Sequence, residues 1–290
     1  MKTLSNPFLK NSDSSIITKH QIVVFLIVTV VISFLVYLWF FLGGGESPEK
    51  VIAMMWTPVI AAGITSLLLK IKLSPYGWRK GKLLFWGYGY LLPVIVALIG
   101  YGIMWITGVT EFYTDEVINY RWARMLGFDT PAPFIAGFFS KLFLASLVTS
   151  VAVLGEEIGW SAFLTPRMVK IYSVPTTSII IGLIWAVWHF PAIISGSYGH
   201  GAPLWAALPG FTLALIGASF FRTVLILRAG SFWPGIIIHT SHNVVLMGIF
   251  NEMTVKTEIS PFVVSESGLF LGLIYLLIGI VFWLINKKQL

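Results

Sequence analysis

The sequence predicts an all-α protein, a polytopic membrane bundle of about eight transmembrane helices with both termini in the cytoplasm. Two observations predict this fold class. Hydrophobic residues make up 57% of the 290 residues and charged residues only 11%, whereas soluble domains carry roughly 25% charged residues. Uncharged apolar runs close to the ~20 residues that a bilayer requires recur along the chain. A chain with this composition has too few polar residues to cover a surface in contact with water. This excludes a soluble enzyme, a disordered chain and a coiled coil.

Eight apolar runs are predicted to span the membrane, and the connections between them are short. The runs are residues 21–42, 51–69, 84–107, 142–165, 175–194, 204–221, 232–250 and 267–286. We divide the chain into N-terminal helices with an outer segment (1–132), a central core (133–250) and a C-terminal helix (251–290). The 108–133 segment is aromatic and mixed in charge, which suits an interfacial helix and a plain extracytoplasmic loop equally well.

The basic residues indicate the orientation of the chain. Most of the 19 lysines and arginines fall in the N-terminal arm, the 70–82 loop, the 167–170 and 222–228 connections and the C-terminal tail, whereas acidic residues gather in the alternate loops. The positive-inside rule therefore places both termini in the cytoplasm. We expect a multi-pass protein of the plasma membrane. The net charge of +7 is then a topology signal, and no nucleic-acid partner is expected.

Ionisable residues inside the predicted spans need a reason, because each costs roughly 2.5–3.5 kcal/mol or more in the bilayer. Counting 1.5 Å per residue from the cytoplasmic ends places Glu156, His189, His239 and Asn243 at a similar depth. The coincidence predicts one shared site, which we expect to open toward the cytoplasm. Adjacent residues point about 100° apart on a helix, so we expect one of Glu156 and Glu157 to face a polar cavity and the other to hold a neighbouring helix.

Each of these residues also has a purely structural explanation. The two glutamates could be solvated at a helix end, and His189 could bond a backbone carbonyl beside Pro191. His239 and Asn243, spaced i and i+4, could serve as hydrogen-bonding glue between helices. His242 lies off their shared face and is predicted to be structural.

The residue types at the predicted site suit hydrolysis by an activated water molecule. A buried glutamate can act as general base with a histidine to shuttle the proton, and a second imidazole and a carboxamide can stabilise an oxyanion. The same groups could instead bind Zn²⁺ through Glu156, His189 and His239. The chain contains no cysteine, so disulfides, thiolate metal sites and cysteine nucleophiles are excluded.

Three dispersed motifs on three predicted spans carry a family resemblance. Glu156-Glu157 matches the start of an EExxxR motif, with Ser161 at the arginine position. The stretch from Trp185 to His189 matches FxxxH with tryptophan in place of phenylalanine, and His239 to Asn243 matches HxxxN in full. Over about residues 133–250 the chain resembles the CPBP family, which includes the CAAX prenyl endopeptidases and bacterial relatives linked to bacteriocin processing and immunity.

This resemblance implies an intramembrane endopeptidase acting on a protein or peptide substrate at the lipid bilayer. It implies that Glu156 and His189 activate water, that His239 and Asn243 stabilise the oxyanion, and that Glu157 supports them. Family members are often catalogued as metallopeptidases, although a metal-independent glutamate mechanism has been argued for the prenyl proteases.

Two other functions stay open at this point. One is a non-catalytic immunity or regulatory protein on the same scaffold, which the missing arginine at Ser161 favours. The other is a proton-coupled transporter, which would need matching polar sites in two halves of the chain.

Overall fold

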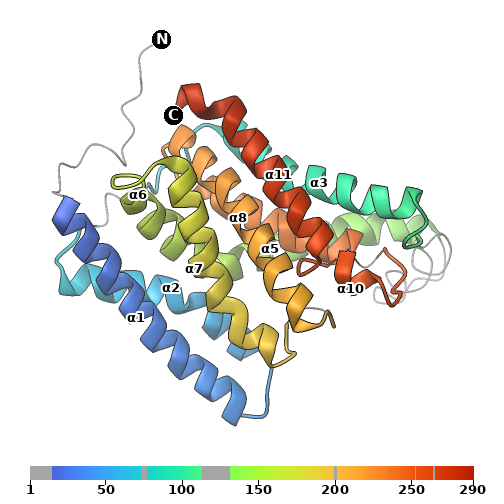
Figure 1. Ribbon diagram of the computed structural model, residues 1–290, viewed down its shortest axis with the longest axis horizontal. Coiled ribbons are helices and arrows are strands. Elements are labelled where there is room, and N and C mark those ends of the chain that lie inside the picture. Colours follow the sequence, from blue (N-terminus) through green and yellow to red (C-terminus); the bar gives the residue numbers. More distant parts are fainter. Residues whose placement is uncertain (1–14, 73–76, 113–130, 199–200, 252, 264) are drawn as a thin grey trace.

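The structure is a computed structural model that describes residues 15–72, 77–112, 131–198, 201–251, 253–263 and 265–290, with the backbone alone for residues 131–141. Within these ranges the chain is helical, apart from turns and one isolated antiparallel bridge between Phe112 and Thr254. The predicted fold class, a polytopic helical bundle, is confirmed (Figure 1). Most of the 108–133 segment lies outside the described residues, so its interfacial helix stays a prediction.

Figure 1 colours the helices by their position in the sequence, from blue at the N-terminus to red at the C-terminus. They are α1 (Ser15–Leu42), α2 (Pro48–Leu68), α3 (Leu83–Ile106), α5 (Pro131–Glu157), η3 (Ile158–Leu164), α6 (Thr165–Met168), α7 (Val174–Ile194), α8 (Leu204–Ala229), α9 (Trp233–Ser241), η4 (His242–Phe250), α10 (Ser260–Val263), α11 (Leu269–Asn286) and η5 (Lys287–Gln289). The segments η3 and η4 are π-helical and continue α5 and α9, while η5 is a short 3₁₀ turn.

Seven helices in the described part of the chain are long and apolar enough to cross a membrane, and each coincides with a predicted span. The eighth predicted span, 232–250, is helical as α9 and η4 but does not belong to that set. Its polar residues His239, His242 and Asn243 lower its apolarity. They are tolerated because α9 packs against α3, α5 and α8 in the bundle, where protein groups and a cavity replace lipid.

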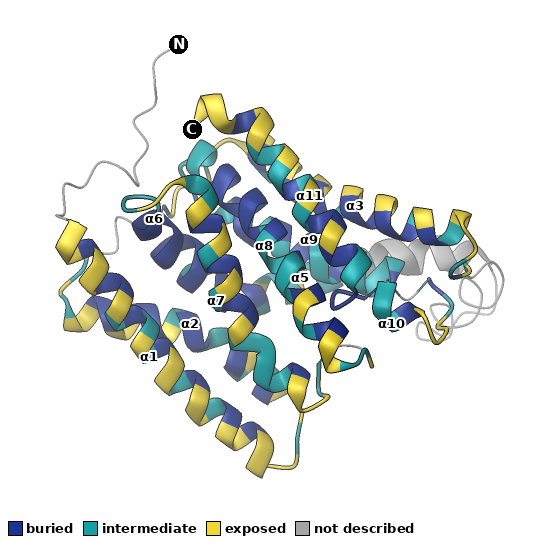
Figure 2. Cartoon of the chain, viewed as in Figure 1, coloured by how far each residue is buried: buried dark blue, intermediate teal, exposed yellow. Residues whose placement is uncertain are grey.

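Exposed apolar side chains cover the outward faces of the peripheral helices, whereas the second half of α8 is buried (Figure 2). This distribution is expected of a protein whose solvent is lipid, because apolar residues on the surface then cost nothing. The most buried span, α8, lies between α7 and α11 and contacts both.

Glycines allow the central helices to approach closely. A Cβ atom on Gly279 of α11 would lie 2.6 Å from the carbonyl oxygen of Gly217 on α8, and a Cβ on Gly217 would overlap the backbone of Tyr275. Gly210 and Gly272 make a second contact of this kind between the same two helices. Small residues at such crossings let the backbones pack directly, which drives association where lipid supplies no hydrophobic force.

Two more glycines place the first motif against α2. A Cβ on Gly155 would lie 2.7 Å from the carbonyl oxygen of Met55, and a Cβ on Gly159 would overlap Pro58. The helix that carries Glu156 and Glu157 therefore crosses α2 at these two points, and the glutamates between them are held at a fixed depth in the bundle.

Candidate active site

The four residues that we predicted to share a site all line one cavity of about 240 Å³. Glu156 comes from the end of α5, His189 from α7, His239 from α9 and Asn243 from the first turn of η4. The wall is completed by α1, α2, α8 and the segment around Glu266 and Tyr275. The convergence of polar side chains from three separate helices on one cavity favours a functional site over independent structural polar residues.

The adjacent glutamates point in different directions. Glu156 lines the cavity, and its Oε2 accepts a hydrogen bond of 2.7 Å from Nε1 of Trp185. Glu157 is fully buried and is not part of the cavity wall. Trp185 occupies the phenylalanine position of the second motif, so the replacement supplies an N–H donor that a phenyl ring lacks. This donor leaves Oε1 of Glu156 available to a reacting water.

Glu157 instead ties three elements together. Its Oε1 accepts from Nη2 of Arg222 at 3.0 Å and from Nδ1 of His239 at 3.1 Å, and its Oε2 accepts from the hydroxyl of Ser161. The close approach of α9 depends on Gly235, because a Cβ there would lie 2.6 Å from Oε2 of Glu157. A buried carboxylate needs this degree of pairing to stay charged.

Arg222 supplies the positive charge that the first motif lacks at Ser161. Its guanidinium also stacks over the ring of Trp185, 4.0 Å from the ring centre. The sequence analysis placed residue 222 in a cytoplasmic connection, which is wrong: α8 continues to Ala229, and Arg222 is only 2% exposed. A helix can carry this charge in the bundle because Glu157 balances it. The signal was present in the sequence, since a buried Glu157 without the motif arginine requires a cation elsewhere.

His189 is oriented by a backbone carbonyl. Its Nδ1 lies 3.0 Å from the carbonyl oxygen of Trp185. A carbonyl only accepts hydrogen bonds, so Nδ1 carries the proton and Nε2 is left as an acceptor. The predicted hydrogen bond from His189 to a backbone carbonyl is therefore present, but it uses Nδ1 alone. The ring lines the cavity beside Phe211 and Tyr198.

His239 and Asn243 line the cavity near Glu156. Nδ1 of His239 donates to the Glu157 carboxylate, which fixes the orientation of the ring. The second ring nitrogen, Nε2, donates a hydrogen bond when the ring carries two protons and accepts one when it carries a single proton. The carboxamide of Asn243 makes no hydrogen bond to any residue that the structure describes, so its donors are available to a ligand.

The sequence analysis did not predict that His242, Tyr275 and Glu266 also line this cavity. His242, predicted to be structural, lines the cavity, where Nδ1 accepts from the Tyr275 hydroxyl at 2.7 Å and Nε2 lies 3.1 Å from Oε2 of Glu266. Burial raises the pKa of Tyr198 well above its ordinary value, and the adjacent Glu266 carboxylate raises it further. Glu266 is one of the acidic residues between predicted spans, and nothing in its local sequence indicated that its side chain lines the cavity.

The cavity residues do not fit a zinc site. Among the described residues no three histidine, aspartate or glutamate side chains come together as a metal-binding group. Nδ1 of His239 faces Glu157 and Oε2 of Glu156 faces Trp185, so hydrogen bonds rather than a shared metal position organise these side chains. The set Glu156, His189 and His239, considered above for zinc, is therefore interpreted without a metal.

Comparisons with known proteins match the same part of the chain. The sequence model described as "Type II CAAX prenyl endopeptidase Rce1-like" matches residues 138–245. A curated relative, "CAAX prenyl protease 2" of Methanococcus maripaludis, is 29% identical over 141 residues, which cover 47% of this chain and 48% of the relative. The chain thus spans about half the length of that relative. Over residues 138–245 the chain is thus similar to the Rce1-like type II CAAX prenyl endopeptidases, the resemblance that its three motifs predicted.

Proposed function

We propose that this chain is an intramembrane endopeptidase of the plasma membrane that hydrolyses a peptide bond of a protein or peptide substrate without a bound metal. One observation carries the proposal: Glu156, His189, His239 and Asn243, contributed by three separate helices, line a single cavity. The family model spans all four residues. Because the match covers only about half of the named relative, the activity of this chain is proposed and not transferred from it.

In the proposed reaction, Oε1 of Glu156 takes a proton from a water molecule whose second hydrogen bonds Nε2 of His189. The water oxygen attacks the carbonyl carbon of the scissile peptide bond. His239 through Nε2 and Asn243 through its amide then donate hydrogen bonds to the oxyanion that forms. The proton held by Glu156 passes to the leaving nitrogen and the C–N bond breaks, which gives an amine and a carboxylic acid. The remaining proton of the acid passes through Nε2 of His189 to solvent and leaves a carboxylate.

The charge network behind this site favours catalysis over the non-catalytic alternative. That alternative depended on the missing arginine at Ser161, and Arg222 occupies the same electrostatic role from another helix. The transporter alternative would need matching polar sites in two halves of the chain. The four motif residues instead converge on one cavity.

The proposal is tested by comparing new protein termini in membranes of cells that express the wild type or Glu156→Gln at matched levels. Glutamine keeps the size of the side chain and can still accept from Trp185, but it cannot take a proton. We expect the termini produced by the wild type to disappear. Glu258→Gln, on an exposed surface residue, is the matched control and should cleave normally. Cleavage by Glu156→Gln at the wild-type rate would refute the role of Glu156.

A further inference from the structure

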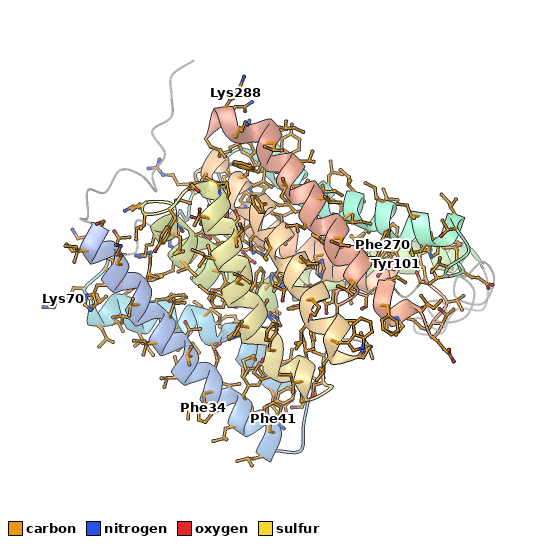
Figure 3. All side chains as sticks on the ribbon, in the orientation of Figure 1. Phe34, Phe41, Lys70, Tyr101, Phe270 and Lys288 are labelled. Atoms are coloured by element: carbon orange, nitrogen blue, oxygen red, sulfur yellow. The ribbon has the colours of Figure 1, made fainter. Side chains whose placement is uncertain are left out.

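The helix ends divide the molecule into two faces with different charge. Figure 3 shows Lys70 and Lys288 on one side of the bundle, away from Phe41 and Phe270. More basic residues near helix ends lie on the same face, namely Lys19, Lys72, Arg79, Lys80, Lys82, Lys170, Arg228 and Lys287, whereas Lys50 and Lys256 lie toward the opposite face. We call it the basic face. The opposite face holds the turn between α1 and α2, the turn between α7 and α8, and the start of α11.

The cavity lies toward this opposite face. It is lined by the last turns of α1, the first turns of α2, the last turns of α7 and the middle of α8, from Phe211 to Arg222. Its wall reaches the surface at Glu46, an exposed residue in the turn between α1 and α2, and includes Ser197 and Tyr198 in the turn between α7 and α8.

Packed aromatic residues close the other end. Trp160, Phe163, Leu164 and Phe232 are at most 1% exposed and belong to one hydrophobic cluster. The first three lie between Glu156 and the end of its helix at the basic face. Phe232 lies between the basic face and His239. Phe25 of α1 packs edge-on against Trp160 and stacks on Phe163, with ring centres 5.9 and 4.7 Å apart. We call this cluster the floor of the cavity.

We propose that the cavity opens on the extracytoplasmic face and that its substrate is a peptide segment presented there, in an exported protein or in the outer flank of a membrane protein. The basic face is cytoplasmic by the positive-inside rule, and the floor separates it from Glu156. The substrate class rests on the proposed function, whereas the direction of opening does not.

This direction reverses the expectation from the sequence. The depth count measured roughly 16–22 Å from the cytoplasmic helix ends to the site residues. In a hydrocarbon core of ~30 Å that is more than half of the way across. The count therefore already placed the residues nearer the outer surface, and packing at the floor decides which end is closed.

The opening is tested by cysteine labelling, for which the natural absence of cysteine gives a blank background. Single variants are made at Ala192 in the cavity wall, at Ala162 in the floor cluster and at Lys288 on the basic face. Each is treated with a membrane-impermeant maleimide in intact and in permeabilised cells. We expect Ala192→Cys to react in intact cells, Lys288→Cys only after permeabilisation, and Ala162→Cys in neither.

Reaction of Ala192→Cys only after permeabilisation, or in neither condition, would overturn the proposal. So would reaction of Lys288→Cys in intact cells. The labelling is repeated in the Glu156→Gln background, where accessibility should be unchanged, so it does not depend on proteolysis. New protein termini that appear with the wild type but not with Glu156→Gln should map to extracytoplasmic segments of the cleaved proteins. Such termini in cytoplasmic segments would contradict the proposed substrate class. A complete lack of such termini would refute the proposed function, while the labelling alone still decides the opening.

Discussion

At the scale of single residues, Glu156 and Glu157 have different tasks because one helical step separates their directions. Glu156 faces the cavity with one oxygen held by Trp185, whereas Glu157 is enclosed by Arg222, His239 and Ser161. A buried carboxylate without its partners would be costly, so Glu157 and Arg222 stabilise each other as a pair. Their pairing also orients His239, which links the hidden glutamate to the cavity.

Removing Arg222 should impair both cleavage and folding. Arg222→Leu leaves Glu157 buried without its cation, and breaking such a pair typically costs ~3–5 kcal/mol. We expect a lower midpoint of thermal unfolding in detergent and loss of the wild-type termini. Arg222→Lys keeps a positive charge near Glu157 and should retain part of the activity, measured as the rate at which those termini form.

Moving the arginine to another position tests whether the site needs the positive charge of Arg222 or only the packing of its side chain. Ser161→Arg in the Arg222→Leu background returns the cation to the motif position, one turn from Glu157. Partial recovery of cleavage in this double variant would show that the charge at Glu157 is what the site needs. Full cleavage by Arg222→Leu alone would contradict the role assigned to Arg222.

At the scale of helices, the direct contact between α8 and α11 keeps Arg222 at its depth. Gly217→Ala should disturb it, because the new Cβ would overlap the backbone of Tyr275. Overpacking of this kind typically costs ~1–3 kcal/mol, so we expect a lower midpoint of thermal unfolding in detergent. Gly102→Ala in α3 is the matched control, since nothing lies within 4 Å of its added Cβ. Equal midpoints for the two variants would show that the contact is not tight.

The helices themselves were largely predictable from the sequence, because a bilayer imposes a fixed length of apolar residues on each span. The exceptions have physical reasons. The span that ends at residue 221 in the sequence analysis continues to Ala229, because Arg222 is neutralised by a residue 65 positions away that no local pattern reveals. The three motifs predicted which side chains meet, whereas Glu266 and Tyr275 joined the cavity through long-range packing.

At the scale of the whole molecule, the separation of charge between the two faces predicts how the chain sits in its membrane. With the basic face inside, a fluorescent protein that folds only in the cytoplasm should fluoresce when fused after Leu290, and a phosphatase that folds only outside should be inactive there. A phosphatase fused in the turn near Glu46 should be active. The reverse pattern would contradict the predicted cytoplasmic termini.

The wide turns that begin at Ile158 and His242 change the phase of two helices. A π turn bonds residue i to i+5 instead of i+4, so the helix after it faces a direction out of step with the helix before it. Glu157 precedes one such change and Ser161 lies within it, and His239 and Asn243 straddle the other. The same residues on regular α-helices would therefore point their side chains in different directions. The spacing of the motifs specifies this cavity only together with the π turns that follow Glu157 and Ser241.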